Sequence, residues 1–332
     1  MNAKFNIKVN KQTELIFIDK IQDINSYISK KQKYIIIDNK VYDLYYDFIK
    51  SLNNVVGIYL IEANENNKSF ETYQNILQDL LEKNITSAVS IIAIGGGITT
   101  DLSGFIAATY KRGIELINIP TTLIGQVDAA IGSKNGVNVG LIKNAVGSYY
   151  EPSHIIVCSE FLKTLDDEHI ICGKLEMIKI ALMFNLKYLE LISEELTSSV
   201  LSKFALLKMK IVTKDRECKN IRNYLNFGHT LGHAIEISFD LPHGIAVGLG
   251  MLLIIQNEAD RTLLTSAFST INFDYKAYFN KIKNIDKNDI INLLKNDKKN
   301  NSDLVTIVTM KKPGHGQLEK LTYQELIDKT FK

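Results

Sequence analysis

The stretch AVSIIAIGGGITTDLSGFIAATY, residues 88–110, decides the fold class. It begins with a short apolar run that is typical of a buried β-strand, and LSGFIAATY after the glycines is expected to form a helix. Glycines at such a junction let backbone N–H groups meet a pyrophosphate at the helix N-terminus. Thr100 stands where the G-x-G-x-x-G fingerprint has its third glycine. The cluster therefore indicates either a dinucleotide-binding turn or an ordinary tight turn.

Three further apolar runs predict strands of the same sheet: KYIIID (33–38), VVGIYLI (55–61) and ELINIP (115–120). Amphipathic segments such as ETYQNILQDLLEK lie between them, and this alternation predicts a parallel sheet with helices on both faces. After about Leu165 the strand signals fade and long helical periods dominate, as in GIAVGLGMLLIIQNEADRTLL. We therefore predict an α/β domain over residues 1–165 and a mainly helical domain over residues 166–332.

Composition excludes several classes of protein. The chain has 332 residues, 45% of them hydrophobic, so it can bury a substantial core. A net charge of +2 without a separate basic run argues against nucleic-acid binding. No apolar run approaches about 18 residues, and the N-terminus lacks a signal-peptide pattern, so no membrane span is expected. Cys158, Cys172 and Cys218 are odd in number and scattered, which predicts free thiols and a cytoplasmic protein.

The segment RNYLNFGHTLGHAIE (222–236) carries four polar side chains at spacings of 4, 3 and 4 residues: Arg222, Asn226, His229 and His233. On one helix this spacing would place them in a single stripe, which would be costly to bury without partners. Gly228 and Gly232 between them cost a helix about 1 kcal/mol each unless another segment must approach closely. The stripe predicts one wall of a polar site, and the alternative is a solvated helix face.

Residues 119–152 form a second polar region, IPTTLIGQVDAAIGSKNGVNVGLIKNAVGSYYEP. Lysines on Gly-rich loops commonly hold phosphate or carboxylate groups, although solvated loop lysines are the plainer interpretation. The density of Gly, Asn and Lys favours an anion site. Its candidate residues are Thr121, Thr122, Asp128, Lys134, Lys143 and Asn144.

A metal site depends on few residues. His229 and His233 have the i, i+4 spacing of zinc-protease helices, but Thr230 replaces the glutamate of H-E-x-x-H. His243 follows Pro242 on the loop after this helix, and Glu176 lies on another predicted helix. Two histidines and one carboxylate with an open position are typical of a catalytic zinc.

Taken together, the motifs resemble the 3-dehydroquinate synthase family of sugar-phosphate cyclases. The similar stretches run from about Asp38 to Gly314: GGGITTDLSGF, YKRG, PTTLIGQVDAAIGSKNGVN, KNAVGSYYEP, LEMIK, RNYLNFGHTLGHAIE, LPHG and the late DKK. The resemblance implies a Rossmann-like NAD-binding domain followed by a mainly helical domain that binds metal and substrate.

The resemblance also implies site residues at matching positions. Zn²⁺, or Co²⁺ in its place, is expected on Glu176, His229 and His243. NAD is expected at Asp38, Glu65, Lys68, Gly96, Gly97, Asp101, Thr121, Thr122, Lys143, Phe161, Leu162, Lys163 and Thr164. The sugar phosphate is expected at Arg112, Asp128, Lys134, Asn144, Lys179, Lys208, Arg222, Asn226, His233 and Lys298. Of these, Lys134, Arg222, Asn226 and His233 are the expected catalytic residues.

Three positions depart from the family pattern. Cys218 stands where the family's Asp-Glu-x-Glu run has its last Glu, Ile245 replaces the Glu of His-Gly-Glu, and Thr100 replaces a Gly. No metal-ligand candidate is lost, so we expect the reaction class to be kept. Glu217 is the neighbouring carboxylate that could substitute for the missing one.

The implied reaction converts 3-deoxy-D-arabino-heptulosonate 7-phosphate into 3-dehydroquinate and phosphate, in the shikimate pathway. It proceeds by transient oxidation with NAD, β-elimination of phosphate, re-reduction and an intramolecular aldol step, in a cytoplasmic homodimer. Three alternatives stay open: a cyclase of the 2-deoxy-scyllo-inosose or valiolone type, a polyol dehydrogenase of the glycerol dehydrogenase type, and a catalytically dead binding or regulatory protein.

Overall fold

The computed structural model describes residues 12–28, 30–140, 142–282, 286–296 and 303–331. The chain forms two compact units. Unit 1 consists of Met1–Pro120, Ser133–Val139 and Lys143–Val157, and unit 2 of Thr121–Gly132, Gly140–Ile142 and Cys158–Lys332. Thr121–Gly132 thus pack with the second unit although they lie within the first predicted domain. The predicted boundary at residue 165 stays a prediction.

Unit 1 is built on a six-stranded sheet with the order β1-β8-β5-β4-β2-β3. Its strands are β1 (Glu14–Ile18), β2 (Lys33–Asp38), β3 (Val55–Ile61), β4 (Ser90–Gly95), β5 (Leu116–Pro120) and β8 (His154–Cys158). The neighbours β3, β2, β4, β5 and β8 pair in parallel. The continuous apolar runs of β2, β4 and β5 reflect burial on both faces, whereas the edge strand β3 is mostly half-buried. The four predicted strands and the parallel sheet are confirmed.

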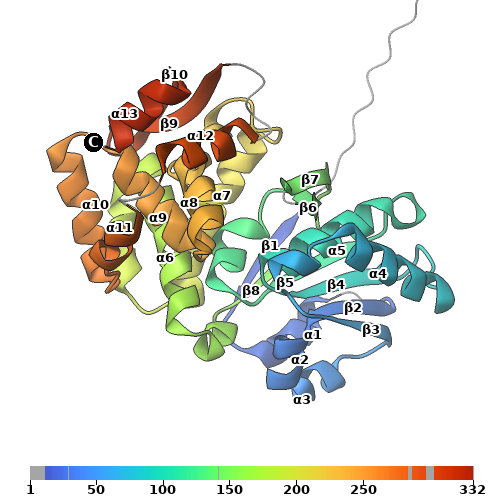
Figure 1. Cartoon of the computed structure of the whole chain (residues 1–332). Coiled ribbons are helices and arrows are strands. Elements are labelled where there is room, and N and C mark those ends of the chain that lie inside the picture. The colour runs from blue at the N-terminus through green and yellow to red at the C-terminus, as the bar shows by residue number, and fades with distance from the viewer. Residues whose placement is uncertain (1–11, 29, 141, 283–285, 297–302, 332) are drawn as a thin grey trace, which may run out of the picture. The chain divides into compact units, whose positions relative to one another are not determined.

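The helices of unit 1 cover both faces of this sheet. Figure 1 shows α4 and α5 on one side of the sheet and α1, α2 and α3 on the other. The helices and 3₁₀ turns are η1 (Ile21–Asp23), α1 (Ile24–Tyr27), α2 (Asn39–Leu44), α3 (Tyr46–Ser51), η2 (Glu65–Asn67), α4 (Phe70–Glu82), α5 (Gly97–Thr109) and η3 (Tyr110–Arg112). A core that includes Ile36, Ile76, Ala93 and Ile106 lies between the sheet and the pair α4 and α5.

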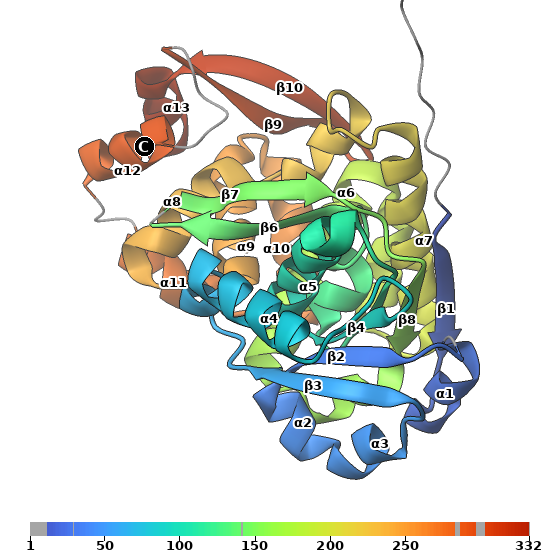
Figure 2. The ribbon, with the colours of Figure 1, turned by 90° about the vertical axis from the view of Figure 1, so that its right-hand side faces the viewer.

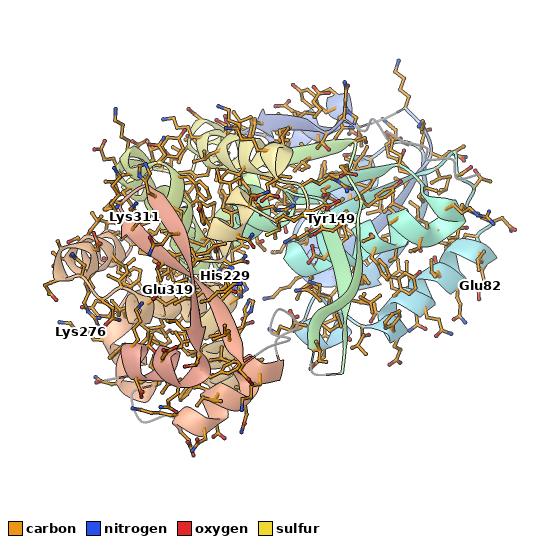
Figure 3. The ribbon with its side chains drawn as sticks, turned by 90° about the horizontal axis from the view of Figure 1, so that it is seen from above. Glu82, Tyr149, His229, Lys276, Lys311 and Glu319 are labelled. Carbon is orange, nitrogen blue, oxygen red and sulfur yellow. The ribbon has the colours of Figure 1, made fainter. Side chains whose placement is uncertain are left out.

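A two-stranded hairpin completes unit 1. It consists of β6 (Lys134–Val139) and β7 (Ile142–Tyr149), which pair with each other. Figure 2 shows the two strands beside α5, and Asn138 of β6 forms a parallel bridge with Ser69 before α4. Tyr149 at the end of β7 and Glu82 at the end of α4 are labelled in Figure 3.

Unit 2 is mainly helical, as predicted. Its helices and helical turns are η4 (Gly125–Ala129), η5 (Ser159–Thr164), α6 (Asp167–Phe184), η6 (Leu186–Ser193), α7 (Ser198–Lys214), η7 (Ile221–Asn226), α8 (His229–Phe239), α9 (His243–Ile254), α10 (Glu258–Thr270), α11 (Tyr275–Ile282), α12 (Lys287–Asn296) and α13 (Tyr323–Thr330). The apolar helix α9 is buried after its first residue and contacts both α6 and α8. It is the centre of the unit.

Unit 2 also contains an antiparallel hairpin that the sequence analysis missed. Its strands are β9 (Leu304–Lys312) and β10 (His315–Thr322), and Lys311 and Glu319 on them are labelled in Figure 3. Glu319 pairs with Lys329 of α13 at 2.8 Å, and the exposed residues of the hairpin are largely polar, with Leu304 and Leu318 as apolar exceptions. A polar face of this kind weakens the strand signal, and the expectation that strands fade after Leu165 was wrong here.

The polar segment 222–236 was predicted to form one helix. It forms instead the 3₁₀ turn η7 followed by α8. Gly228 separates them with a left-handed φ of +79°, a conformation that favours glycine. A Cβ at Gly228 would lie 2.6 Å from the carbonyl oxygen of Val247, so α9 approaches here at backbone distance. The close approach predicted from the two glycines is present. The single four-residue stripe is not.

Three further findings concern expectations from the sequence. No helix in the described residues is long and apolar enough to cross a membrane. Cys158, Cys172 and Cys218 are all free thiols, as predicted. His243 was expected on a loop but is the first residue of α9, directly after Pro242.

Candidate functional site

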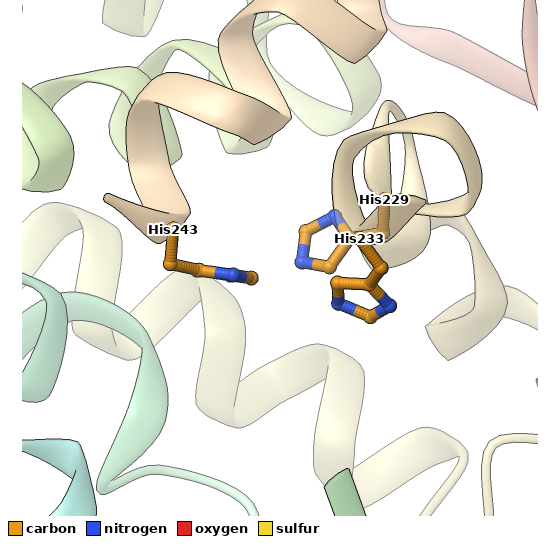
Figure 4. Close-up of side chains that lie close together, drawn as sticks. All are labelled: His229, His233 and His243. Carbon is orange, nitrogen blue, oxygen red and sulfur yellow. The ribbon is translucent and has the colours of Figure 1, made fainter. Parts of the chain in front are cut away.

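Three histidines of unit 2 lie together at the starts of two adjacent helices. His229 begins α8, His233 follows one turn later, and His243 begins α9. Their ring centroids are 5.2–5.7 Å apart. Each ring offers one nitrogen such that the three nitrogens lie within 4.8 Å of one another. Figure 4 shows the three imidazoles around a common space. Gly228 brings α8 against α9 and thereby places the three rings near one another.

Glu176 adds a buried carboxylate to these histidines from the middle of α6. Its side chain is fully buried, and its Oε1 lies 3.8 Å from Nε2 of His229 and 3.5 Å from Nε2 of His243. No hydrogen-bond donor reaches Oε1 in the described part of the chain. Burial raises the pKa of Glu176, and the nearby cation of Lys179 only partly offsets this effect. A buried carboxylate oxygen that faces two imidazole nitrogens has the donor set that a divalent metal such as Zn²⁺ requires.

Glu236 holds His243 from the other side of its ring. Its Oε2 lies 3.0 Å from Nδ1 of His243, and its side chain is 12% exposed. Burial alone would lower the pKa of His243, but the hydrogen bond to Glu236 and the charge of Glu176 outweigh burial and raise it. For His229 the direction is opposite, because burial and the nearby Lys179 hold its pKa well below the ordinary value. The bond at Nδ1 leaves Nε2 of His243 as the nitrogen that faces Glu176.

A buried cluster of charges lies next to Glu176. Asp128 is in the π-helical turn η4, a local form that is frequent at functional sites. It pairs with Lys179 of α6 at 3.1 Å and with Lys208 of α7, and Lys179 also pairs with Glu176. Burial opposes the charge of Asp128, but the two lysines outweigh it and hold the pKa of Asp128 well below its ordinary value. Lys179 stays charged because the carboxylates of Asp128 and Glu176 outweigh its own burial and raise its pKa.

Arg222 is buried and fixed at several points. Its Nη2 donates to the carbonyl oxygen of Gly132 at 2.8 Å, and its Nη1 donates to that of Arg216 at 2.5 Å. Asp215 accepts three backbone N–H bonds, from Lys219, Asn220 and Arg222, at 2.7–3.0 Å. Asp215 therefore shapes the turn that carries Arg222, a role that its sequence position alone did not reveal.

The glycine cluster lies at the carboxyl end of β4, as the dinucleotide interpretation requires. Chain order reverses here, because β3 lies on one side of β2 and β4 on the other. Asp38 ends β2 and Gly95 ends β4, so both border this switch point, where open α/β sheets bind ligands. Gly96 is the N-cap of α5 and offers no side-chain cap, which leaves the helix N-terminus open to a phosphate. The side chain of Asp38 accepts from the N–H of Lys40 at 2.9 Å, and burial raises the pKa of Asp38.

Other cofactor candidates in unit 1 are bonded to one another. Lys68 is 5% exposed, and its Nζ lies 2.5 Å from Oδ2 of Asp101 and 2.7 Å from Oδ1 of Asn144. Asn138, for which no role was predicted, bonds both to Glu65 and to Asn144. These residues come from η2, α5 and the β6–β7 hairpin, so three separate segments meet here.

The predicted site residues are divided between the two units. In unit 1 lie Asp38, Glu65, Lys68, Gly96, Gly97, Asp101, Arg112, Lys134, Lys143 and Asn144. In unit 2 lie Thr121, Thr122, Asp128, Phe161, Leu162, Lys163, Thr164, Glu176, Lys179, Lys208, Arg222, Asn226, His229, His233 and His243. Lys298 lies outside the described residues. The metal-ligand candidates come together within unit 2, and their roles stay predictions.

Two of the three departures from the family pattern lie in well-packed positions. Thr100 is buried in the first turn of α5 and donates from Oγ1 to the carbonyl oxygen of Gly97 at 3.1 Å. Ile245 is buried in the apolar interior around α9. Cys218 has a left-handed φ of +61°, and Glu217 beside it is exposed and pairs with Lys219 at 2.5 Å. The carboxylate of Glu217 is therefore engaged at the surface, and its role as a substitute for the missing Glu stays a prediction.

Sequence reasoning missed three residues that hold others in place: Glu236, Asp215 and Asn138. A signal existed for Glu236, because it follows His233 by three residues and so continues the same helical face. Asp215 and Asn138 bond to groups that are distant in sequence or to backbone, and no spacing rule reports such contacts.

Comparisons with known proteins agree with this organisation. Residues 58–172 match the family model of the 3-dehydroquinate synthase N-terminal domain, and residues 173–300 match that of the C-terminal domain. A 3-dehydroquinate synthase of Pelagibacter ubique is 34% identical, with 97% of this chain and 95% of the relative covered. Another, from a Thermoanaerobacter species, is 33% identical with 92% of each covered. A third, from Clostridium tetani, is 40% identical over 69% of this chain and 65% of the relative.

Solved structures share the fold. A 2-epi-5-epi-valiolone synthase from Streptomyces hygroscopicus with NAD⁺ and Zn²⁺ bound matches with a TM-score of 0.85 at 22% identity, over 99% of this chain and 98% of that one. A 2-deoxy-scyllo-inosose synthase in complex with carbaglucose-6-phosphate, NAD⁺ and Co²⁺ matches with a TM-score of 0.81 at 22% identity, over 96% and 95%. At this identity the likeness shows the fold: a parallel-sheet domain followed by a helical domain.

Proposed function

The chain belongs to the 3-dehydroquinate synthase family, and on that premise we propose that it converts 3-deoxy-D-arabino-heptulosonate 7-phosphate into 3-dehydroquinate and phosphate. By outcome this makes it a carbon–oxygen lyase. The observation that carries the proposal is the buried Glu176, whose Oε1 faces His229 and His243. Lys179 pairs with Oε2 of this carboxylate, whereas Oε1 has no hydrogen-bond donor in the described residues and is costly to bury unless a further cation approaches it.

We propose that Glu176, His229 and His243 hold Zn²⁺, with Co²⁺ as a substitute. The residues fit this ion, because the set contains two imidazoles and one carboxylate and its Oε1 has no hydrogen-bond donor in the described residues. When bound, the ion would polarise a substrate hydroxyl and ease its deprotonation. His233 borders the same space, and we assign it to proton transfer with the substrate rather than to the metal.

We propose that NAD binds at the switch point of the unit 1 sheet, with its pyrophosphate at the N-terminus of α5. The residues fit, because Gly96 leaves the helix amides without a side-chain cap and Thr99 has a buried Oγ1 with no hydrogen-bond partner in the described residues. When bound, NAD would supply an oxidation and the matching reduction, so that it ends the reaction unchanged. Lys68, Asp101 and Lys143 would contact the cofactor from unit 1.

The remaining residues would bind and orient the substrate. Arg222 presents a planar guanidinium that suits a carboxylate, and Lys179 supplies positive charge. Lys208 lies near Arg222, and burial lowers its pKa. Asp128 accepts from both lysines and holds their ammonium groups in place. We assign Lys134, Asn144 and Lys298 to the binding of the substrate phosphate. This phosphate is a negatively charged leaving group and can accept the proton that the elimination removes.

One experiment tests the proposed function. The metal-loaded protein is incubated with the heptulosonate phosphate, with and without NAD, and phosphate release is measured. We expect release that requires NAD. Accumulation of one NADH per substrate would indicate a dehydrogenase instead, and absence of any reaction despite bound zinc and NAD would indicate a non-catalytic protein.

A further inference from the structure

Asn138 of β6 lies at the centre of a chain of hydrogen bonds within unit 1. Its backbone N–H donates to the carbonyl oxygen of Lys68 at 2.8 Å. Its side-chain amide donates to Oε1 of Glu65 at 2.8 Å and to the carbonyl oxygen of Glu65 at 3.2 Å. Its side-chain oxygen accepts from the N–H of Asn144 at 2.7 Å. Both the donors and the acceptor of this carboxamide are therefore in use.

The chain continues from Asn144 to α5. Asn144 has a left-handed φ of +50°, and its Oδ1 accepts from Nζ of Lys68, which also pairs with Asp101. The continuous path runs from Glu65 through Asn138, Asn144 and Lys68 to Asp101. Four of these five residues are proposed contacts of cofactor or substrate, and Asn138 joins the turn that carries Glu65 and Lys68 to the hairpin strand that carries Asn144.

Only a carboxamide can make this set of bonds. Oδ1 must accept from a backbone N–H while Nδ2 donates to a carboxylate and a carbonyl oxygen. An aspartate would keep the acceptor but would place a second negative charge against Glu65. An apolar residue of the same size would make none of these side-chain bonds, so Glu65 and the N–H of Asn144 would each lose a partner.

We propose that Asn138 is a positioning residue of the cofactor site: it fixes the turn at Glu65–Lys68 against the hairpin strand at Lys143–Asn144, so that Lys68 is presented to NAD in one geometry. This inference rests on the proposed function, because the role of the turn depends on the cofactor. Asn138 itself need not touch the cofactor.

The chain offers a matched control in the same strand. Asn135 also uses a carboxamide, and it donates to the carbonyl oxygens of Ser133 at 2.8 Å and of Tyr150 at 3.0 Å. Asn135→Asp therefore removes the same kind of donor from the same hairpin without touching Glu65, Lys68 or Asn144. A general loss of hairpin stability would affect both variants alike.

The test compares the Kd for NAD of wild type, Asn138→Asp, Asn135→Asp, Glu65→Gln and the double variant Glu65→Gln/Asn138→Asp, all with zinc bound. We expect Asn138→Asp to weaken NAD binding about tenfold, which corresponds to the loss of one or two hydrogen bonds. Asn135→Asp should stay within about twofold of wild type. Because Glu65 is itself an expected NAD contact, the double variant should lose less affinity than the product of the two single losses, since a glutamine at position 65 can donate to the new carboxylate.

A second readout does not depend on NAD. In Asn138→Asp without cofactor, amide hydrogen exchange should accelerate in peptides that cover residues 65–68 and 142–146, and the double variant should slow it again. The inference would be overturned by an unchanged Kd in Asn138→Asp, by an equal loss in Asn135→Asp, or by a double variant whose loss equals or exceeds the product of the two single losses. A wild type that binds no NAD would overturn the proposed function itself, whereas unchanged exchange in the two peptides would overturn the link through Asn138.

Discussion

Replacing Glu236 by Ala should weaken metal binding, although Glu236 is not itself a proposed metal ligand. Its Oε2 lies 3.0 Å from Nδ1 of His243, which fixes the ring and leaves Nε2 toward Glu176. Loss of such a partner of a ligating histidine typically costs about 10–100-fold in metal affinity, or about 1.4–2.7 kcal/mol. Because the His243 side chain is 35% exposed, water can replace part of the bond, and we expect a loss of about 10–30-fold.

The assay is a competition between the metal-free protein and a zinc chelator of known affinity, with thermal unfolding measured in parallel. Glu236→Gln keeps an acceptor but loses the charge, so its loss should be smaller. The control is Ile237→Ala, the neighbouring position on α8 with a 51% exposed side chain, which should bind zinc as the wild type does. If Glu236→Ala bound zinc within twofold of wild type at unchanged stability, the ring of His243 would not depend on this hydrogen bond.

Three further outcomes follow from the same geometry. His229→Ala should lose stoichiometric zinc while His233→Ala keeps it, as measured by elemental analysis, and the reverse pattern would move the metal to the other imidazole. Metal binding should release protons as pH falls toward the ordinary pKa of histidine, because the pKa of His243 is raised by Glu236 and Glu176 and a ligating imidazole must be neutral, so affinity should weaken as pH falls. Titration calorimetry in buffers of different ionisation enthalpy checks this, and no proton release would contradict it. Arg222→Lys should lose about 1.5–3 kcal/mol of transition-state binding in kcat/KM, because an ammonium cannot replace a planar guanidinium, and an unchanged value would remove Arg222 from the substrate site.

The parallel sheet of unit 1 could be predicted from sequence because its central strands are buried on both faces. β2 and β3 have the residues that their apolar runs predicted, and β4 and β5 differ from prediction by one or two residues at their ends. The edge strand β1, the inner strand β8 and the hairpins β6–β7 and β9–β10 were missed. In β1 and the hairpins, polar residues on an exposed face dilute the apolar pattern, whereas β8 is buried but has only four apolar residues after His154. Edge and surface strands owe their existence to pairing, which a single run of sequence does not display.

The site was predictable in its residue types but not in its local geometry. The two glycines correctly indicated a close approach, and Gly228 also ends the turn before α8, which the spacing alone concealed. The contribution of Asp128 depends on a π-helical turn that brings its carboxylate to lysines on two other helices. Such contacts arise from tertiary packing and leave no periodic trace in the sequence.

The most direct test of the proposed function is the stoichiometry of phosphate release at limiting NAD. Zinc-loaded protein is given excess heptulosonate phosphate and substoichiometric NAD, and phosphate and NADH absorbance are followed together. A cyclising lyase should release many phosphates per NAD with no lasting rise in NADH. No phosphate, or one NADH for each substrate consumed, would contradict it.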